Sequence, residues 1–222
     1  MNALVINNTE YKAPDKLTVK QWMEMSKWDT TIPTHFKHVL GIAMSVPEEY
    51  VELIPDELAG VGMTLISGLL NPLGKPYKRE LNESELIDFK SMPLSKFIDL
   101  EVYIDQGFDK ALDRMVNTLY DTDDSSDWDV SDVFGAVFAF LSYRSTIYKS
   151  YKHLFTSDEV SEEKTKPQIA KVWYDIVMVL ADGKFLEIDK VLERTVIECF
   201  NWLAWNKDKQ RREHNAIKNI TR

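Results

Sequence analysis

The sequence predicts a mainly α-helical protein, with a helical domain of about seven or eight helices, a small N-terminal β-hairpin and a candidate for one further short strand. Two observations carry this prediction. Apolar residues recur at three- and four-residue spacing through most of the chain, and most of these segments open with a capping residue or an early proline. The chain has 222 residues, of which 44% are hydrophobic and 11% aromatic, so it is long enough for one large domain or two small ones.

The N-terminal part begins with the hairpin and continues as helices. In "ALVINNTEYKAP", Asn7 and Asn8 separate two short apolar runs, and Asn tolerates the positive φ angles that tight hairpin turns need. Thr18 and Gln21 form a capping-box pattern for a helix that runs to about Lys27. Three further helices are predicted, over 33–45, from Pro47 with Ser45 as the cap, and from Pro55. The last contains glycines at 60, 62 and 68, which indicate either close helix packing or a looser element.

A connection rich in Pro and Gly, "NPLGKPYKRELNE" at 71–83, is the best candidate for an internal boundary. It separates an N-terminal part, 1–74, from a C-terminal helical part, 84–222, although the two can form one continuous domain. "ELIDFKSM" at 85–92 is compatible with a short strand. The expected helices lie between Pro93 and Gly107, over 108–120, from a cap at Asp129 or Ser131 to Phe155, over 168–181 and from Thr195 to the C-terminal end. "SDEVSEEKTKP" at 157–167 is a charged linker.

One short pattern recurs along the chain. "LTVKQW", "PLSKF" and "TVIECF" each open a predicted helix and place an aromatic residue about four positions in. We interpret the recurrence as common helix-start chemistry. No longer unit repeats cleanly, so a solenoid is not predicted.

Composition excludes several classes of function. The net charge of −9 argues against a nucleic-acid binder, which needs a basic face. No apolar stretch is long enough to cross a membrane, and no basic segment followed by an apolar run predicts a signal peptide. The single cysteine, Cys199, excludes an internal disulfide and is expected to be buried. The sequence has no nucleophile elbow, phosphate loop, dinucleotide fingerprint or zinc signature, so we expect no enzyme and no cofactor.

The segment "DTDDSSDWDVSD" at 121–132 is the one metal-like feature. Asp121, Asp123 and Ser125 match the first ligand positions of an EF-hand, and Asp132 falls at the twelfth. The sixth position is Ser126, where the loop needs Gly, and the twelfth is not Glu, so we expect no metal site. The segment is interpreted as a flexible acidic loop or as a charged patch that faces a basic partner.

The last helix changes character along its length. It begins with aromatic residues and ends in a basic arm, 206–222, which holds six basic and two acidic residues and so carries a net charge of +4. Two interpretations stay open: a solvated helix, or an arm that docks on an acidic neighbouring subunit. The residues predicted to make protein contacts are Trp202, Trp205, Arg211, Arg212, Ile217 and Ile220 on this helix, and Asp123, Asp124 and Asp127 in the acidic loop.

Three stretches resemble proteins encoded among the tail and neck genes of tailed bacteriophages, in the tail-assembly-chaperone-like family. They are "LTVKQWMEMSKWD" followed by "HFKHVLGIAMSVPEEYVELIPDEL", then "MPLSKFIDLEVYIDQGFDKALDRMVNTLY", and finally "VLADGKFLEIDKVLERTVIECFNWLAWNKDK". The resembled pattern is a helix, a Pro-Glu-Glu turn and a Leu-x-Pro-x-x-Leu step, then a helix pair and a C-terminal helix. The family offers no catalytic residues to carry over.

The resemblance implies a non-enzymatic morphogenesis protein, made in the host cytoplasm. One role is a ring subunit in the neck or tail of the virion, whose partners are copies of itself and neighbouring neck, tail or portal proteins. The alternative is a tail assembly chaperone that binds the tape-measure protein and is absent from the mature particle. The composition alone is also compatible with a host-type acidic helical adaptor protein that binds one regulatory partner.

Overall fold

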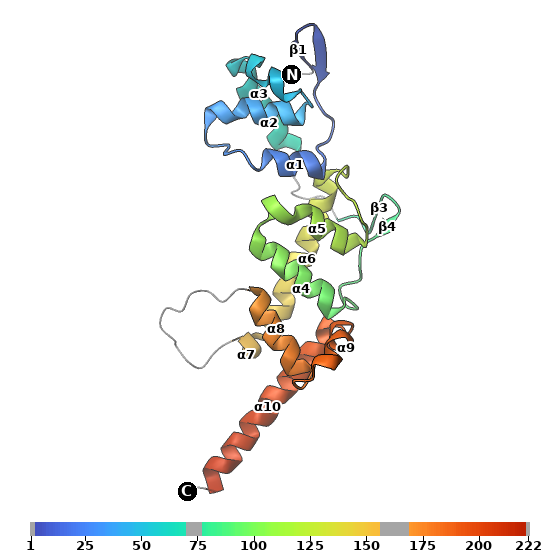
Figure 1. Ribbon diagram of the computed structural model, residues 1–222, viewed down its shortest axis with the longest axis vertical. Helices are drawn as coiled ribbons and strands as arrows, with labels where there is room; N and C mark the ends of the chain where they lie inside the picture. Colours follow the sequence, from blue (N-terminus) through green and yellow to red (C-terminus); the bar gives the residue numbers. More distant parts are fainter. Residues whose placement is uncertain (1–2, 70–76, 156–168, 221–222) are drawn as a thin grey trace. The chain divides into compact units, whose positions relative to one another are not determined.

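The computed structural model describes residues 3–69, 77–155 and 169–220, and it confirms a mainly helical chain with an N-terminal β-hairpin (Figure 1). The expected connection at 71–83 is described only from Tyr77 onward, and the linker at 157–167 lies outside the described residues. The strands are β1 Ala3–Ile6, β2 Thr9–Lys12, β3 Glu80–Leu81 and β4 Ser84–Glu85. The α-helices are α1 Val19–Met25, α2 Phe36–Ala43, α3 Asp56–Leu69, α4 Leu94–Gln106, α5 Phe108–Tyr120, α6 Val130–Ser150, α7 Lys152–Phe155, α8 Ile169–Leu180, α9 Ile188–Leu192 and α10 Val196–Ile220. The 3₁₀-helices are η1 Pro33–His35, η2 Glu48–Leu53 and η3 Phe185–Glu187.

The chain forms two compact units, and neither is one continuous segment. Unit 1 is Met1–Leu86 with Gln106–Ala139, and unit 2 is Ile87–Asp105 with Phe140–Arg222. The charge is divided unevenly between them. Unit 1 contains 10 basic and 20 acidic residues, whereas unit 2 contains 17 and 16, so their net charges are −10 and +1.

The N-terminal hairpin and the start of α1 in unit 1 form as predicted. β1 and β2 pair antiparallel, and the two turn residues Asn7 and Asn8 both have positive φ, as a tight hairpin turn requires. The capping box is present at α1, since the Thr18 side chain accepts from the Gln21 backbone N–H and the Gln21 side chain accepts from the Thr18 backbone N–H. The glycines of α3 left close packing and a looser element as alternatives, and close packing is found at Gly62, where a Cβ would lie 2.5 Å from a methyl carbon of Leu40 on α2.

Several boundaries differ from the prediction. The helix expected over 33–45 begins as η1 and becomes α-helical only at Phe36. Ser45 is not a helix cap; it adopts a positive φ of 57°, and the following element is the 3₁₀-helix η2, whose N-cap is Pro47. The helix expected to reach Phe155 ends at Ser150, and α7 follows as a separate turn. Of the strand expected over 85–92, only Glu85 lies in a strand, at the end of β4, and residues 86–92 form none.

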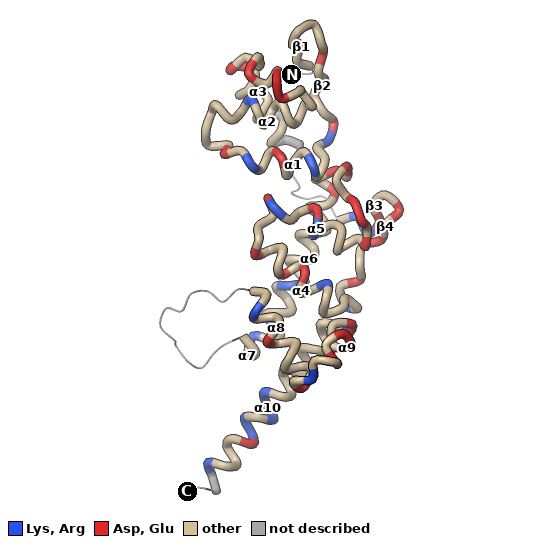
Figure 2. Tube along the Cα trace, viewed as in Figure 1, with Lys and Arg blue, Asp and Glu red and all other residues tan. Residues whose placement is uncertain are grey.

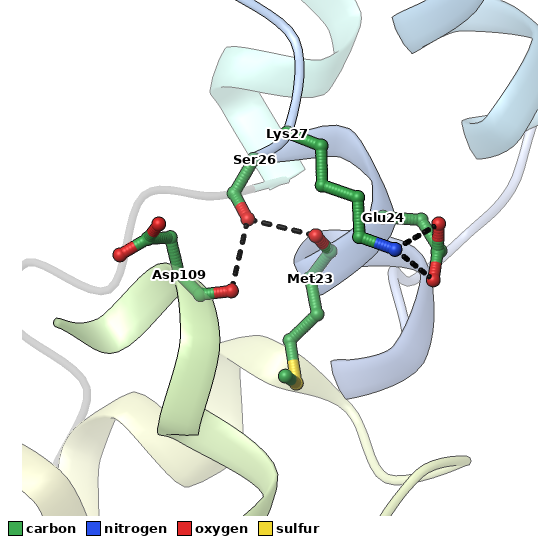
Figure 3. A network of polar contacts seen from close by, with 5 residues as sticks. All are labelled: Met23, Glu24, Ser26, Lys27 and Asp109. Atoms are coloured by element: carbon green, nitrogen blue, oxygen red, sulfur yellow. Dashed lines mark hydrogen bonds and ion pairs between the residues drawn. The ribbon is translucent and has the colours of Figure 1, made fainter. Parts of the chain in front are cut away.

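α1 packs against α5 within unit 1. The Ser26 hydroxyl donates to the Met23 carbonyl at 2.8 Å and lies 3.4 Å from the carbonyl oxygen of Asp109, at the start of α5 (Figure 3). On the solvent side of the same turn, Lys27 pairs with Glu24 at 2.7 Å. The Ser26 hydroxyl therefore contacts both the last turn of α1 and the first turn of α5.

The N-terminal ends of α1 and α6 are paired by an antiparallel bridge in unit 1. Thr18 lies opposite Asp129. The Val19 N–H donates to the Trp128 carbonyl at 3.0 Å, and the Val130 N–H donates to the Leu17 carbonyl at 2.8 Å. Two backbone donors that helix ends usually leave unpaired are satisfied in this way.

Unit 2 repeats this arrangement at the starts of α4 and α10. Pro93 lies opposite Thr195 in an antiparallel bridge. The Leu94 N–H donates to the Arg194 carbonyl at 2.7 Å, and the Val196 N–H donates to the Met92 carbonyl at 3.1 Å. The recurring "LTVKQW", "PLSKF" and "TVIECF" patterns thus form paired helix starts, which common helix-start chemistry alone does not require.

The core of unit 2 is a cluster of aromatic rings. Phe97 of α4 and Phe200 of α10 are completely buried and meet edge to face, with 6.1 Å between ring centroids. Trp173 of α8 packs on both, at 5.7 Å and 6.3 Å, and Phe140 of α6 contacts Phe97. Edge-to-face pairs of this kind add stability beyond the area they bury.

Candidate interaction surfaces

The distal part of α10 has no buried face. Every side chain from Lys207 to Lys218 is exposed, and five of the seven charged residues in this segment are basic (Figure 2). Two ion pairs support it along its own length, Arg211 with Asp208 at 3.4 Å and Lys209 with Glu213 at 3.9 Å. Such pairs contribute only about 0.2–0.5 kcal/mol each, and solvated helical segments of this length are marginally stable in water.

Large apolar side chains are exposed on the C-terminal helices of unit 2. Trp205 of α10 is 53% exposed and lies 6.5 Å from Trp202, which is also exposed. Lys209 sits over the Trp205 ring at 5.5 Å, where the cation and the ring face attract each other. The other large exposed apolar residues described on α8, η3 and α10 are Tyr174, Val179, Phe185, Leu186 and Ile217.

A groove of about 540 Å³ lies among α8, α9 and the first turns of α10. Trp202 and Val191 line it together with charged groups of both signs, including Glu187 and Arg194. Cys199 also lines the groove and is buried, as predicted, and burial raises the pKa of its thiol to about 11. The thiol is therefore protonated at neutral pH, which is the opposite of an activated nucleophile.

The acidic loop between α5 and α6 is built by local hydrogen bonds. Asp124 accepts from the Ser126 N–H at 2.8 Å, and this bond lowers the pKa of its carboxyl group. Asp129 caps α6, since its Oδ1 accepts from the backbone N–H and the hydroxyl of Ser131 at 2.9 Å and 2.8 Å. Asp123 and Asp127 are exposed, and their carboxylates pair with no other described residue.

The residues that match EF-hand positions point to other partners. Ser125 is buried and its hydroxyl lies 3.4 Å from the carbonyl oxygen of Asp113, while Asp132 pairs with Lys78 at 2.6 Å. Asp121 adopts a left-handed conformation as the C-cap of α5. Across residues 3–69, 77–155 and 169–220, no group of three or more His, Cys, Asp or Glu side chains is arranged to hold a metal ion.

Unit 2 contains a buried carboxylate, Glu101, which pairs with the partly exposed Arg144. Glu101 is 2% exposed, and Arg144 donates to its two oxygens at 2.5 Å and 2.9 Å. Burial raises the pKa of Tyr148, whose ring lies beneath the Arg144 guanidinium, and it raises the pKa of Tyr143 as well. These shifts favour the neutral phenols, so they make neither tyrosine a better base or nucleophile.

Unit 1 presents a partly exposed aromatic face that the sequence did not reveal. Trp22 of α1 meets Phe134 of α6 edge to face at 5.3 Å, and Phe134 stacks on Phe138 at 6.1 Å. Phe138 is 52% exposed, and the other two rings are half-buried. We refer to these three residues as the aromatic face.

The structure places the predicted interaction residues in two groups. Trp202, Trp205, Arg211, Arg212 and Ile217 are exposed along α10 in unit 2, whereas Asp123, Asp124 and Asp127 are exposed in the acidic loop of unit 1. The side chain of Ile220 lies outside the described part of the chain. The aromatic face and the exposed pair Phe185–Leu186 were not predicted, because a lone apolar residue in a helical pattern gives no sign of being exposed.

No helix in the described part of the chain has the length and apolar character needed to span a membrane. The chain matches no protein-family model, no curated protein and no solved structure.

Proposed function

We propose that this protein is a non-enzymatic subunit of an oligomeric assembly, a ring in the neck or tail of a tailed bacteriophage, and that the distal part of α10 joins neighbouring copies. The observation that carries this proposal is the exposed basic helix itself. Trp205 lies just before this basic segment and is 53% exposed, and Ile217 lies within it and is 62% exposed. A helix of this kind gains most of its stability from packing on a partner.

The charge distribution supports a copy of the same chain as that partner. The arm carries +4 at 206–222, and unit 1 carries −10. Opposite charges on two surfaces of one molecule favour contacts between copies in which one presents the arm and the next presents unit 1. The resemblance to phage tail and neck proteins adds the setting in which such contacts form rings.

The first test is the mass of the full-length protein in solution, measured by light scattering beside a variant that ends at Asn206. We expect the full chain to form a defined oligomer and the shortened chain to be a monomer. The circular dichroism of the shortened chain should show that the helices it keeps are still folded. The same loss is expected when Arg211 and Arg212 are both replaced by Glu. Lys149→Glu with Lys152→Glu is the matched control, since these residues are exposed in unit 2 but lie off the arm. An oligomer that survives removal of the arm refutes the proposal.

Mass spectrometry of purified particles that carry this sequence in their genome separates the roles. Many copies per particle indicate the ring subunit. Absence from particles, together with a soluble complex with a long helical protein, indicates the tail assembly chaperone. A monomer found in neither setting, with one host partner, supports the adaptor alternative.

A further inference from the structure

The two paired helix starts are preceded by similar elements at matching positions in the sequence. Asn7 to Trp22 aligns in sequence without gaps on Asn82 to Phe97, and this offset of 75 positions matches the two hairpin turns and the two bridged residues Thr18 and Pro93. Both turns have positive φ at their two central residues. On the partner helices, Asp129 to Phe134 corresponds to Thr195 to Phe200.

The aligned positions include two corresponding aromatic pairs. Trp22 corresponds to Phe97 and Phe134 corresponds to Phe200, and each pair meets edge to face across its bridge, at 5.3 Å and 87° in unit 1 and at 6.1 Å and 80° in unit 2. Position, partner and ring geometry agree between the two pairs. We therefore use the surroundings of Phe97 and Phe200 in unit 2 as a template for what Trp22 and Phe134 contact in unit 1.

The template pair is covered by further helices. Trp173 of α8 lies edge-on to Phe97 and stacks on Phe200 with an interplanar angle of 16°. Tyr151 and Phe155 enclose Phe200 at 5.3 Å and 5.7 Å. Both template rings are fully buried as a result. Their cover therefore consists of helices that bring aromatic side chains.

The matching pair in unit 1 lacks such a cover among the described residues. Trp22 and Phe134 stay half-buried, and the next ring along α6, Phe138, is more than half exposed. The surface around the aromatic face belongs to the unit with a net charge of −10, and the exposed carboxylates of Asp124 and Asp127 lie in the loop that leads into α6. A suitable cover is a helix that carries aromatic rings beside basic side chains.

We propose that α10 of a second copy covers the aromatic face, with Trp202 and Trp205 on the rings and the basic residues beyond them toward the acidic loop. α10 combines exposed tryptophans with a run of basic residues. The tryptophans can pack on the aromatic face, and the basic residues are attracted by the negative charge of unit 1. This inference rests on the proposed self-association and names the surface that receives the arm.

The test replaces Phe138 by Arg in the full-length chain and compares it with Val61→Arg, which places the same charge on an equally exposed helical apolar residue of unit 1. We expect the dissociation constant of the oligomer to rise about ten-fold or more for Phe138→Arg, as is typical of a lost aromatic anchor, and to change little for Val61→Arg. Equal constants for the two variants overturn the inference.

A photo-crosslinking amino acid, p-benzoylphenylalanine, at position 138 gives a second measurement that keeps an aromatic ring in place. In a mixture of isotope-labelled and unlabelled copies, we expect mixed-isotope crosslinks to peptides from 201–218. Crosslinks between copies that map elsewhere overturn the inference. If removal of the arm dissociates the oligomer but Phe138→Arg does not, the receiving surface is wrong and the proposed function stands. If removal of the arm changes nothing, the proposed function itself fails.

Discussion

Replacing Arg144 by Met should destabilise the protein more than any exposed charge change. The substitution keeps the side-chain stem but leaves the carboxylate of Glu101, which is 2% exposed, without its two hydrogen bonds. Breaking a buried pair from one side typically costs about 3–5 kcal/mol. The Arg144 side chain is 34% exposed, so water can reach part of the site. We therefore expect a loss of about 2–3 kcal/mol.

A double variant separates the ion pair from simple packing. When Glu101→Leu is combined with Arg144→Met, no charge stays buried, and the free energy of unfolding should recover to within about 1 kcal/mol of the original protein. Part of the remaining difference is the lost contact between the guanidinium and the Tyr148 ring, which lies 4.7 Å away.

The assay is urea unfolding followed by circular dichroism, with equal m-values as the condition for comparing free energies. Lys171→Met is the matched control, because it removes an exposed partner of Asp175 and should cost less than about 0.5 kcal/mol. The reasoning is refuted if Arg144→Met costs no more than Lys171→Met, or if the double variant is less stable than Arg144→Met alone.

Three further outcomes are expected. Raising the NaCl concentration from about 0.05 M to about 0.5 M should weaken self-association measured by sedimentation equilibrium, because salt screens the attraction between the arm and unit 1; tighter association at high salt would contradict this. The Cys199 thiol should react slowly with Ellman's reagent at pH 8 in the folded protein and quickly in urea, since it is buried with a pKa of about 11, and its reactivity should rise only as the pH approaches that value. Thr195→Ala should lower the free energy of unfolding by about 1 kcal/mol through loss of its capping box with Glu198, measured by urea unfolding; an unchanged midpoint would show that the bridge to Pro93 alone fixes this helix start.

Features set by neighbouring residues could be predicted from the sequence. The hairpin turn at Asn7 and Asn8 and the capping boxes at Thr18 and Thr195 each depend on contacts within four positions. The segment after Ser45 has the same local signs and still forms a 3₁₀-helix. In that segment Val51 packs on the α2 backbone at Gly41. A Cβ added to Gly41 would lie 2.8 Å from a methyl carbon of Val51. Tertiary packing decides such cases against local propensity.

The candidate surfaces were predicted only in part. A run of basic residues is visible in any sequence, so the exposed arm could be named residue by residue. The aromatic face could not, because Trp22 and Phe134 lie 112 positions apart and meet only through a bridge between two helix starts. The sequence does carry one sign of this arrangement, the recurrence of "LTVKQW" and "PLSKF". The similarity also includes the hairpin turn that precedes each of these helix starts.

The proposed contact joins two different surfaces, and this decides what assemblies it can build. One copy contributes α10 and the next contributes the aromatic face, so the interface is heterologous rather than two-fold symmetric. Such a contact generates a closed ring if the rotation between neighbours closes and an open filament if it does not. A ring predicts that the measured mass reaches a plateau as concentration rises, because every arm then occupies a face. A filament predicts a mass that keeps growing, since one arm and one face are always left at its ends. A plateau in the mass of the full-length chain, lost on Phe138→Arg but kept on Val61→Arg, therefore tests the ring and the receiving surface in one experiment.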